Sequence, residues 1–258
     1  MASQWRMLIQ WVLLFEGITG LVLNLILLCA NIDRRTRFQW LPYRLCIMVA
    51  AIHGVLQSSL TLFGLWAHIF VDGYFAVVWY GPVIYFPSWM QHLVCDIGVM
   101  SIFCIWQLIP APCILQYLTL CRRHMTDARR LVLSYAYVCL LIMMTSVFVL
   151  NFIPTQEFRK LLRASAISVH ELHEEEDDFE VYGLSIMPDE RNMNRSALAM
   201  TVFGVIPTYV LAYAAFVWTS VKIRRKLASH DDLQLSSRTM DMQKKFMRMQ
   251  ILQARFIS

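Results

Sequence analysis

Charged residues are scarce in this 258-residue sequence. Asp, Glu, Lys and Arg together make up 16% of it, against about 25% in an average soluble domain. Hydrophobic residues make up 58%, against roughly 45–50% in such a domain. So much apolar content excludes a disordered chain, and it argues against a soluble globular enzyme. The class that remains is an integral membrane protein.

The sequence also lacks the short motifs that carry enzyme chemistry. It contains no nucleotide-binding loop, no nucleophile elbow and no H-E-x-x-H sequence. The seven cysteines include no C-x-x-C pair, which argues against a metal or redox centre. His170 and His173 stand close to Glu171, but two histidines three residues apart are a weak metal signal. We therefore expect no catalysis, no cofactor and no metal.

Long apolar runs are what the chain has instead. A bilayer core of about 30 Å needs roughly 20 apolar residues, and they must be helical because lipid offers the backbone no hydrogen-bond partner. Five segments are long enough. They are residues 7–32, 43–70, 91–120, 131–153 and 197–223. The sequence thus predicts an all-α integral membrane protein, with a bundle of five transmembrane helices within residues 1–223.

The positive charge is segregated between these spans, which predicts their orientation. The net charge is +5, and basic blocks follow the first, third and fifth spans. The second loop, residues 71–90, contains no Lys or Arg, and the fourth, residues 154–196, carries the acidic run 171–180. Cytoplasmic loops are enriched in Lys and Arg, so we expect the N-terminus outside. Membrane topology, and not nucleic-acid binding, explains the basic balance.

The two outer loops have distinct compositions. Residues 71–90 are rich in aromatics, which favours an interfacial aromatic belt, or alternatively the lip of an apolar ligand pocket. The acidic run is too charged to build a core, so we expect it to be a solvated, mobile part of a long extracellular loop. Asn194 begins an N-x-S glycosylation sequence. Because it adjoins the fifth span, we expect it to be unmodified.

A few residues inside the spans stand out chemically. Among the ionisable ones are Glu16, His53, His68 and Asp96, and such residues are costly at membrane depth. Their spacing does not indicate a proton relay. Prolines interrupt two spans, at positions 110, 112 and 207, and each removes a helical hydrogen bond. They predict kinks, which serve either as fixed structure or as bending points.

Four local patterns resemble a known family. They are Gly20-x-x-x-Asn24 in the first span, Tyr43-Arg44-Leu45 opening the second, ILQYLTL with Tyr117 at the inner end of the third, and SRTMDMQKKFMRMQILQ in the tail. In this order and topology they resemble the nematode serpentine chemoreceptors of the Str-type superfamily. The resemblance implies a seven-helix, G-protein-coupled chemosensory receptor in the plasma membrane, for instance of a sensory cilium.

The resemblance also implies sites and partners. A small environmental molecule would bind between the outer halves of spans two, three and five, near Asp96, Met100 and Phe203. The surface facing a heterotrimeric G protein would include Gln116, Tyr117, Arg122 and Arg123. Two alternatives stay open: an accessory subunit that assembles with full-length receptors, and a small transporter.

Three features depart from the resemblance. Gln116 stands where the inner-end pattern has an arginine. The fourth loop contains no cysteine that could bond with Cys95. The chain reaches Ser258 before a sixth span, so we expect an incomplete bundle with a basic cytoplasmic tail, residues 224–258, at the start of helix six. Met242, Phe246 and Met249 in this tail also fit an amphipathic helix on the inner leaflet.

Overall fold

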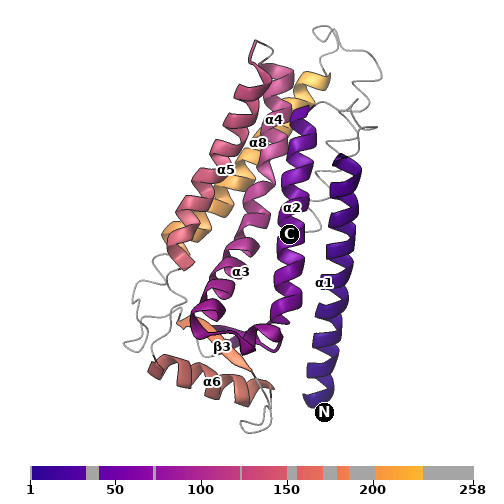
Figure 1. Ribbon diagram of the computed structural model, residues 1–258. Coiled ribbons are helices and arrows are strands. Elements are labelled where there is room, and N and C mark those ends of the chain that lie inside the picture. Colours follow the sequence, from indigo (N-terminus) through magenta and orange to yellow (C-terminus); the bar gives the residue numbers. More distant parts are fainter. Residues whose placement is uncertain are drawn as a thin grey trace.

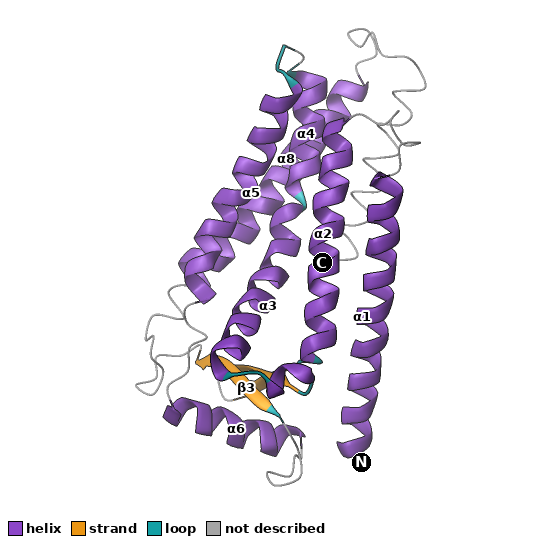
Figure 2. Ribbon diagram, in the orientation of Figure 1, coloured by secondary structure: helices purple, strands orange, loops and turns teal. Residues whose placement is uncertain are grey.

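The computed structural model describes residues 2–32, 41–71, 74–122, 124–149, 156–170, 179–185 and 201–228. These residues form a bundle of long helices with a small sheet at one end (Figures 1 and 2). The bundle helices are α1 (Ala2–Ile32), α2 (Leu41–Gly64), α3 (Ser88–Leu108), α4 (Pro110–Cys121), α5 (Asp127–Val149) and α8 (Ile206–Ala228). Residues 171–178 of the predicted acidic run, Asn194 and the tail from 229 onward lie outside the described residues.

Five stretches of helix are long and apolar enough to cross a membrane. They are Met7–Ile32, Pro42–Gly64, Ser88–Cys121, Asp127–Ser146 and Val202–Leu227. The third combines α3 with α4, and the fifth combines the π-helical turn η4 (Thr201–Val205) with α8. The prediction of a mostly helical membrane protein with five spans is confirmed.

The remaining described elements form a cap over one end of the bundle, beside the start of α1 (Figure 1). The cap consists of β1 (Ala67–Val71), β2 (Tyr74–Trp79), the short helix η2 (Pro82–Tyr85), α6 (Gln156–His170) and β3 (Glu180–Ser185). We call this end the capped end. The opposite end, which carries Arg122 and Arg224, is the basic end. By the predicted orientation the capped end is extracellular.

The sheet is one layer between α6 and the bundle. Its strands are antiparallel in the order β1-β2-β3, and Val77 of β2 lies opposite Tyr182 of β3. Successive side chains of a strand point to opposite faces. Val77 and Trp79 accordingly join a buried cluster with Trp66, while Ala76 and Val78 join another with Phe158 of α6.

The second span is shorter than predicted. It was predicted to reach residue 70, but α2 ends at Gly64 and Leu65 has a left-handed φ of 43°. A left-handed residue is a common way to end a helix. A Cβ at Gly64 would overlap the ring of Trp79, so the chain turns here against the cap. The apolar residues 67–71 form β1. Hydropathy alone does not distinguish an apolar strand from the last turns of an apolar helix.

The aromatic segment 71–90 is only partly a surface belt. Trp79 is 1% exposed and packs against Trp66, with ring centroids 5.1 Å apart. Tyr85 and Trp89 are exposed. The aromatic content therefore builds the core of the cap as well as its rim.

The prolines mark two irregular points in the bundle. Pro110 and Pro112 open α4, and the N–H of Ile109 reaches back to Trp106 in place of the regular ladder. Pro207 lies just after η4 at the start of α8. It has no N–H for the carbonyl of Phe203, four residues earlier, and a π-helical turn lies at this point.

The α1–α2 contact depends on small residues. A Cβ at Gly20 would overlap the Ser58 hydroxyl, and a Cβ at Gly54 would overlap the Asn24 amide. Asn24 also donates to the carbonyl of Gly20 at 2.7 Å. Small residues let transmembrane helices approach closely, so the Gly20-x-x-x-Asn24 pattern has a packing role.

Candidate ligand-binding and coupling sites

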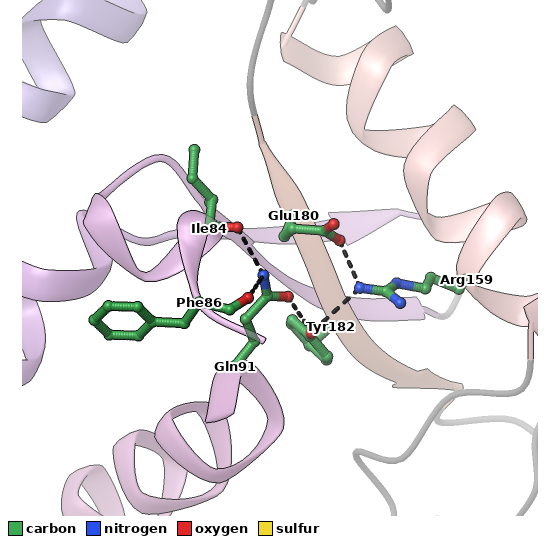
Figure 3. A network of polar contacts seen from close by, with 6 residues as sticks. All are labelled: Ile84, Phe86, Gln91, Arg159, Glu180 and Tyr182. Atoms are coloured by element: carbon green, nitrogen blue, oxygen red, sulfur yellow. Dashed lines mark hydrogen bonds and ion pairs between the residues drawn. The ribbon is translucent and has the colours of Figure 1, made fainter. Parts of the chain in front are cut away.

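A hydrogen-bonded chain connects the cap with the start of α3 (Figure 3). The Gln91 amide nitrogen donates to the carbonyls of Ile84 and Phe86, at 2.8 and 2.9 Å. The Tyr182 hydroxyl donates to Gln91 Oε1 at 2.7 Å. Gln91 is buried, and its amide is thus satisfied on both sides. These hydrogen bonds join η2, β3 and α3 into one unit.

Arg159 of α6 continues this chain toward the outer surface of the cap. Its Nη2 donates to Glu180 at 2.6 Å and to the Tyr182 hydroxyl at 3.2 Å. Burial raises the pKa of Tyr182 to about 12, so the hydroxyl keeps its proton at neutral pH and can donate to Gln91.

The three candidate ligand-binding residues lie in different surroundings. Asp96 is half-buried on α3, and Met100, one turn further, packs against the cluster of Trp66 and Trp79. Phe203 on η4 is 76% exposed. The structure therefore brings Asp96 and Met100 onto one stretch of α3 below the cap, whereas Phe203 points out of the described bundle.

Aromatic side chains of α3 and α8 meet directly below this stretch. Phe103 and Trp106 of α3 both contact Tyr209 of α8, with ring centroids 6.3 and 5.7 Å apart. Met100, Phe103 and Tyr209 all pack against the same buried cluster. Sequence reasoning missed Tyr209, because its contact with α3 depends on a helix about 100 residues later in the chain.

His53 is an ionisable residue inside the second span, and the structure shows a polar partner for it that the sequence did not predict. Its Nε2 lies 3.0 Å from the carbonyl oxygen of Ser101 and 3.2 Å from the Ser101 hydroxyl. This contact ties α2 to α3. Glu16, by contrast, is exposed on α1 and has no hydrogen bond to another described residue. His68 lies in β1, not in a membrane span.

A second polar node lies where α3 ends. Gln107 is 2% exposed, and its amide nitrogen donates to the Thr145 hydroxyl and to the carbonyl of Leu141 on α5. The Thr145 and Thr208 hydroxyls lie 3.4 Å apart, and Thr208 donates to the carbonyl of Val205 in η4. We call Gln107, Thr145 and Thr208 the polar node.

The polar node joins the two irregular points of the bundle. Gln107 stands just before the break at Ile109, and Thr208 follows Pro207. The amide oxygen of Gln107 is buried and has no hydrogen-bond partner among the described residues. A buried acceptor without a partner costs about 1–3 kcal/mol.

The residues predicted to face a G protein divide into buried and exposed ones. Gln116 is 0% exposed and lies inside the bundle. Tyr117 is half-buried against Trp218 of α8, with centroids 4.9 Å apart, and Arg122 is exposed at the end of α4. Arg123 lies outside the described residues. Because its side chain is enclosed, Gln116 is not on the surface of the basic end.

A further arginine organises the basic end. Arg130 of α5 is buried, and its guanidinium donates to Asp127 at 2.8 Å and to the carbonyl of Arg122 at 3.3 Å. It thereby closes the turn between α4 and α5. Sequence reasoning counted Arg130 among the loop charges, where hydropathy gives no sign that an arginine turns inward.

No group of three or more His, Cys, Asp or Glu side chains that could hold a metal occurs among the described residues. Cys95 is buried below the cap as a free thiol. The strand β3 is instead held by its pairing with β2 and by the Tyr182–Gln91 hydrogen bond.

The comparison with known proteins agrees with this architecture. A family model described as serpentine type 7TM GPCR chemoreceptor Srd matches residues 9–256, nearly the whole chain. No curated protein matches the sequence. The family model spans the described helices α1 to α8 together with the cap.

Proposed function

Because the chain belongs to the Srd family of serpentine-type seven-transmembrane GPCR chemoreceptors, we propose that it detects a small environmental molecule and signals to a heterotrimeric G protein. The observation that carries this proposal is the family match over residues 9–256 on a multi-pass helical membrane protein. The family argues against the small transporter. Residence in the plasma membrane, for instance of a sensory cilium, is part of the proposal.

We propose that the ligand contacts the outer half of α3 around Asp96 and Met100. Asp96 offers a half-buried carboxyl, and Met100 offers an adaptable apolar surface next to the aromatic contacts of Phe103 with Tyr209. A carboxyl inside a membrane span marks a functional site by default. Phe203, from η4, would reach this ligand only after a rearrangement of that turn.

The mechanism we propose is a population shift between two helix arrangements, biased by the ligand. The polar node supports it, because the node joins the break between α3 and α4 to the π-helical turn before α8. A ligand that draws α3 and α8 together would change the geometry at Gln107 and Thr208. The bend would then reach Tyr117 and Arg122 at the basic end, which we propose as the G-protein-facing surface together with Arg123.

A signalling assay in heterologous cells tests this function. The full chain is expressed with a G protein and a second-messenger reporter, and a panel of volatile and water-soluble small molecules is applied. We expect at least one compound to give a saturable response that Asp96→Asn weakens by about tenfold or more, which corresponds to roughly 1.4 kcal/mol of binding.

The matched control is Glu157→Gln, which neutralises an exposed carboxyl on α6. It should leave the response unchanged at equal surface expression. A protein that reaches the cell surface and responds to nothing in the panel, whichever G protein is supplied, would contradict the proposed function.

A further inference from the structure

The outer surface of the cap has a groove that the mechanism above does not use. Two adjoining depressions share Arg163 and Glu180 in their walls. The first is lined also by Arg159, Lys160 and Val181, and the second by Ile84, Tyr85 and Phe179. We call the two together the cap groove. It lies between α6, β3 and η2.

Positive charge is in excess in the cap groove. Its charged residues are three cations and one carboxylate, and the carboxylate of Glu180 is already paired with Arg159 at 2.6 Å. Lys160 is exposed, Arg163 is half-buried, and neither forms an ion pair with a described residue. Within the described part of the chain, two positive charges one helical turn apart therefore remain for a ligand.

Arg163 is held over an aromatic ring of the groove wall. Its guanidinium carbon lies 4.5 Å from the centroid of the Phe179 ring. Stacking on an aromatic ring occupies one face of a guanidinium and leaves its N–H groups directed outward in the plane, where they match both oxygens of a carboxylate. The stacked side chain loses less rotational freedom on binding than an unsupported one.

The rest of the groove wall is apolar. Tyr85 is 75% exposed, and Ile84 stands beside it in η2. An inorganic anion would leave this surface unused, whereas an organic anion would cover it with its carbon skeleton. Aromatic side chains contribute most to such contacts.

We propose that the cap groove binds a small organic anion, a carboxylate on an aromatic or aliphatic body, with the carboxylate at Arg163 and Lys160 and the body against Tyr85. This gives the receptor a second ligand site, apart from the one proposed around Asp96 and Met100, and rests on the proposed function. Arg159 lines the groove and also donates to the Tyr182 hydroxyl, which in turn donates to Gln91 on α3. The groove is thus connected to α3 by two hydrogen bonds.

Direct binding to the full chain tests the proposal without any signalling. The protein is placed in nanodiscs of net-neutral phosphatidylcholine, and binding of 4-(trifluoromethyl)benzoate is followed by fluorine NMR. We expect saturable binding that Arg163→Gln weakens by about fivefold or more and Arg163→Lys by less, since Lys keeps the charge without the planar fork. The neutral 4-(trifluoromethyl)benzyl alcohol should bind about tenfold more weakly.

Lys222→Gln is the matched control, because Lys222 is exposed at the opposite end of the bundle, and it should bind the benzoate as the unmodified protein does. Thermal melting of each variant establishes that it is folded. Equal binding by Arg163→Gln, equal binding of the alcohol, or no binding by the unmodified protein would overturn the proposal. Displacement of the benzoate by added anionic phosphatidylglycerol would overturn it in favour of a lipid phosphate.

The signalling assay and the benzoate-binding measurement can fail independently of each other. A chain that binds benzoate through Arg163 but gives no cellular response keeps the groove and refutes the proposed signalling. A chain that signals but binds benzoate equally well without Arg163 keeps the receptor function and refutes the groove.

Discussion

The Tyr182 hydroxyl of β3 lies 2.7 Å from Oε1 of Gln91 in the first turn of α3, and it donates its hydrogen there. This bond fastens the segment before α8 to the top of α3. Cys95, one turn along α3, remains a free thiol. A hydrogen bond of this kind is worth about 0.5–1.5 kcal/mol net. It can therefore break and re-form in the folded protein, which a disulfide at the same place could not do.

A double-mutant cycle measures this contact. Tyr182→Phe removes the donor and leaves the buried Gln91 oxygen without its partner, so we expect a loss of about 1–3 kcal/mol in unfolding free energy. Gln91→Ala should cost more, because it also removes the donor to the Ile84 and Phe86 carbonyls. The double variant should cost less than the sum, because both changes break the Tyr182–Gln91 bond. Thermal unfolding in detergent gives the values. Additive losses would show that the two side chains do not interact.

Alkaline pH should weaken the cap through Tyr182. An unfolded tyrosine has a pKa of about 10, and burial raises the pKa of Tyr182 to about 12. Between these values the folded protein holds a proton that the unfolded chain has lost, so stability is fully present below about pH 10 and falls as the pH rises toward 12. We expect the melting temperature to fall more steeply over this window in the unmodified protein than in Tyr182→Phe. Parallel curves would contradict the assignment.

The α1–α2 contact should not tolerate a side chain at Gly54. Gly54→Leu would overlap the Asn24 amide, and we expect destabilisation of about 1–3 kcal/mol from overpacking and a drop in correctly folded protein at the membrane. Gly204→Ala is the matched control, since a Cβ there would meet only the Met144 carbonyl oxygen at 3.5 Å. Size-exclusion profiles and melting curves measure both. A normal melting temperature for Gly54→Leu would mean that α1 packs differently.

Removing the unsatisfied amide of the polar node should stabilise the bundle. Gln107→Met keeps the length of the side chain and deletes the buried oxygen that has no partner, while Thr145 still donates to the Leu141 carbonyl at 3.0 Å. We expect unfolding free energy to rise by about 1 kcal/mol. If the node takes part in signalling, the ligand response in the cellular assay should weaken at the same time. A fall in stability equal to that of Gln107→Ala would contradict this.

The spans could be read from the sequence because the bilayer imposes one length and one secondary structure on them. The predicted and observed bounds of the helices differ where charged residues or tertiary contacts set the helix ends. The fourth span was predicted to begin at residue 131, but α5 begins at Asp127. Its first turn is capped by Thr126, whose hydroxyl accepts from the N–H of Arg129 at 3.4 Å. A charged first turn is part of the helix, although its low hydropathy excludes it from a predicted membrane span.

The cap was not predicted, for two different reasons. The pairing of Val77 with Tyr182 joins residues about 100 positions apart, and nothing in a single sequence indicates which strand pairs with which. The helix α6 did leave a signal, because Phe158, Leu162 and Ala166 recur every four residues and are all buried. That pattern lay in a loop interpreted as acidic and solvated.

The candidate site could be predicted only in part from the sequence. Asp96 and His53 were identified because ionisable residues are conspicuous in an apolar run. Their surroundings were not, since the Ser101 partner of His53 and the polar node of Gln107 each depend on how two or three helices are rotated against one another.

The dependence of α1 on α2 bears on how the protein is made. Among the described elements α1 packs chiefly against α2, through Gly20 and Gly54, and its outer side is open, with Phe15 74% exposed. Chains emerge from the ribosome at about 5–20 residues per second. This helical hairpin is contained in the first 64 residues. It can therefore assemble in the membrane several seconds before α8 has been synthesised.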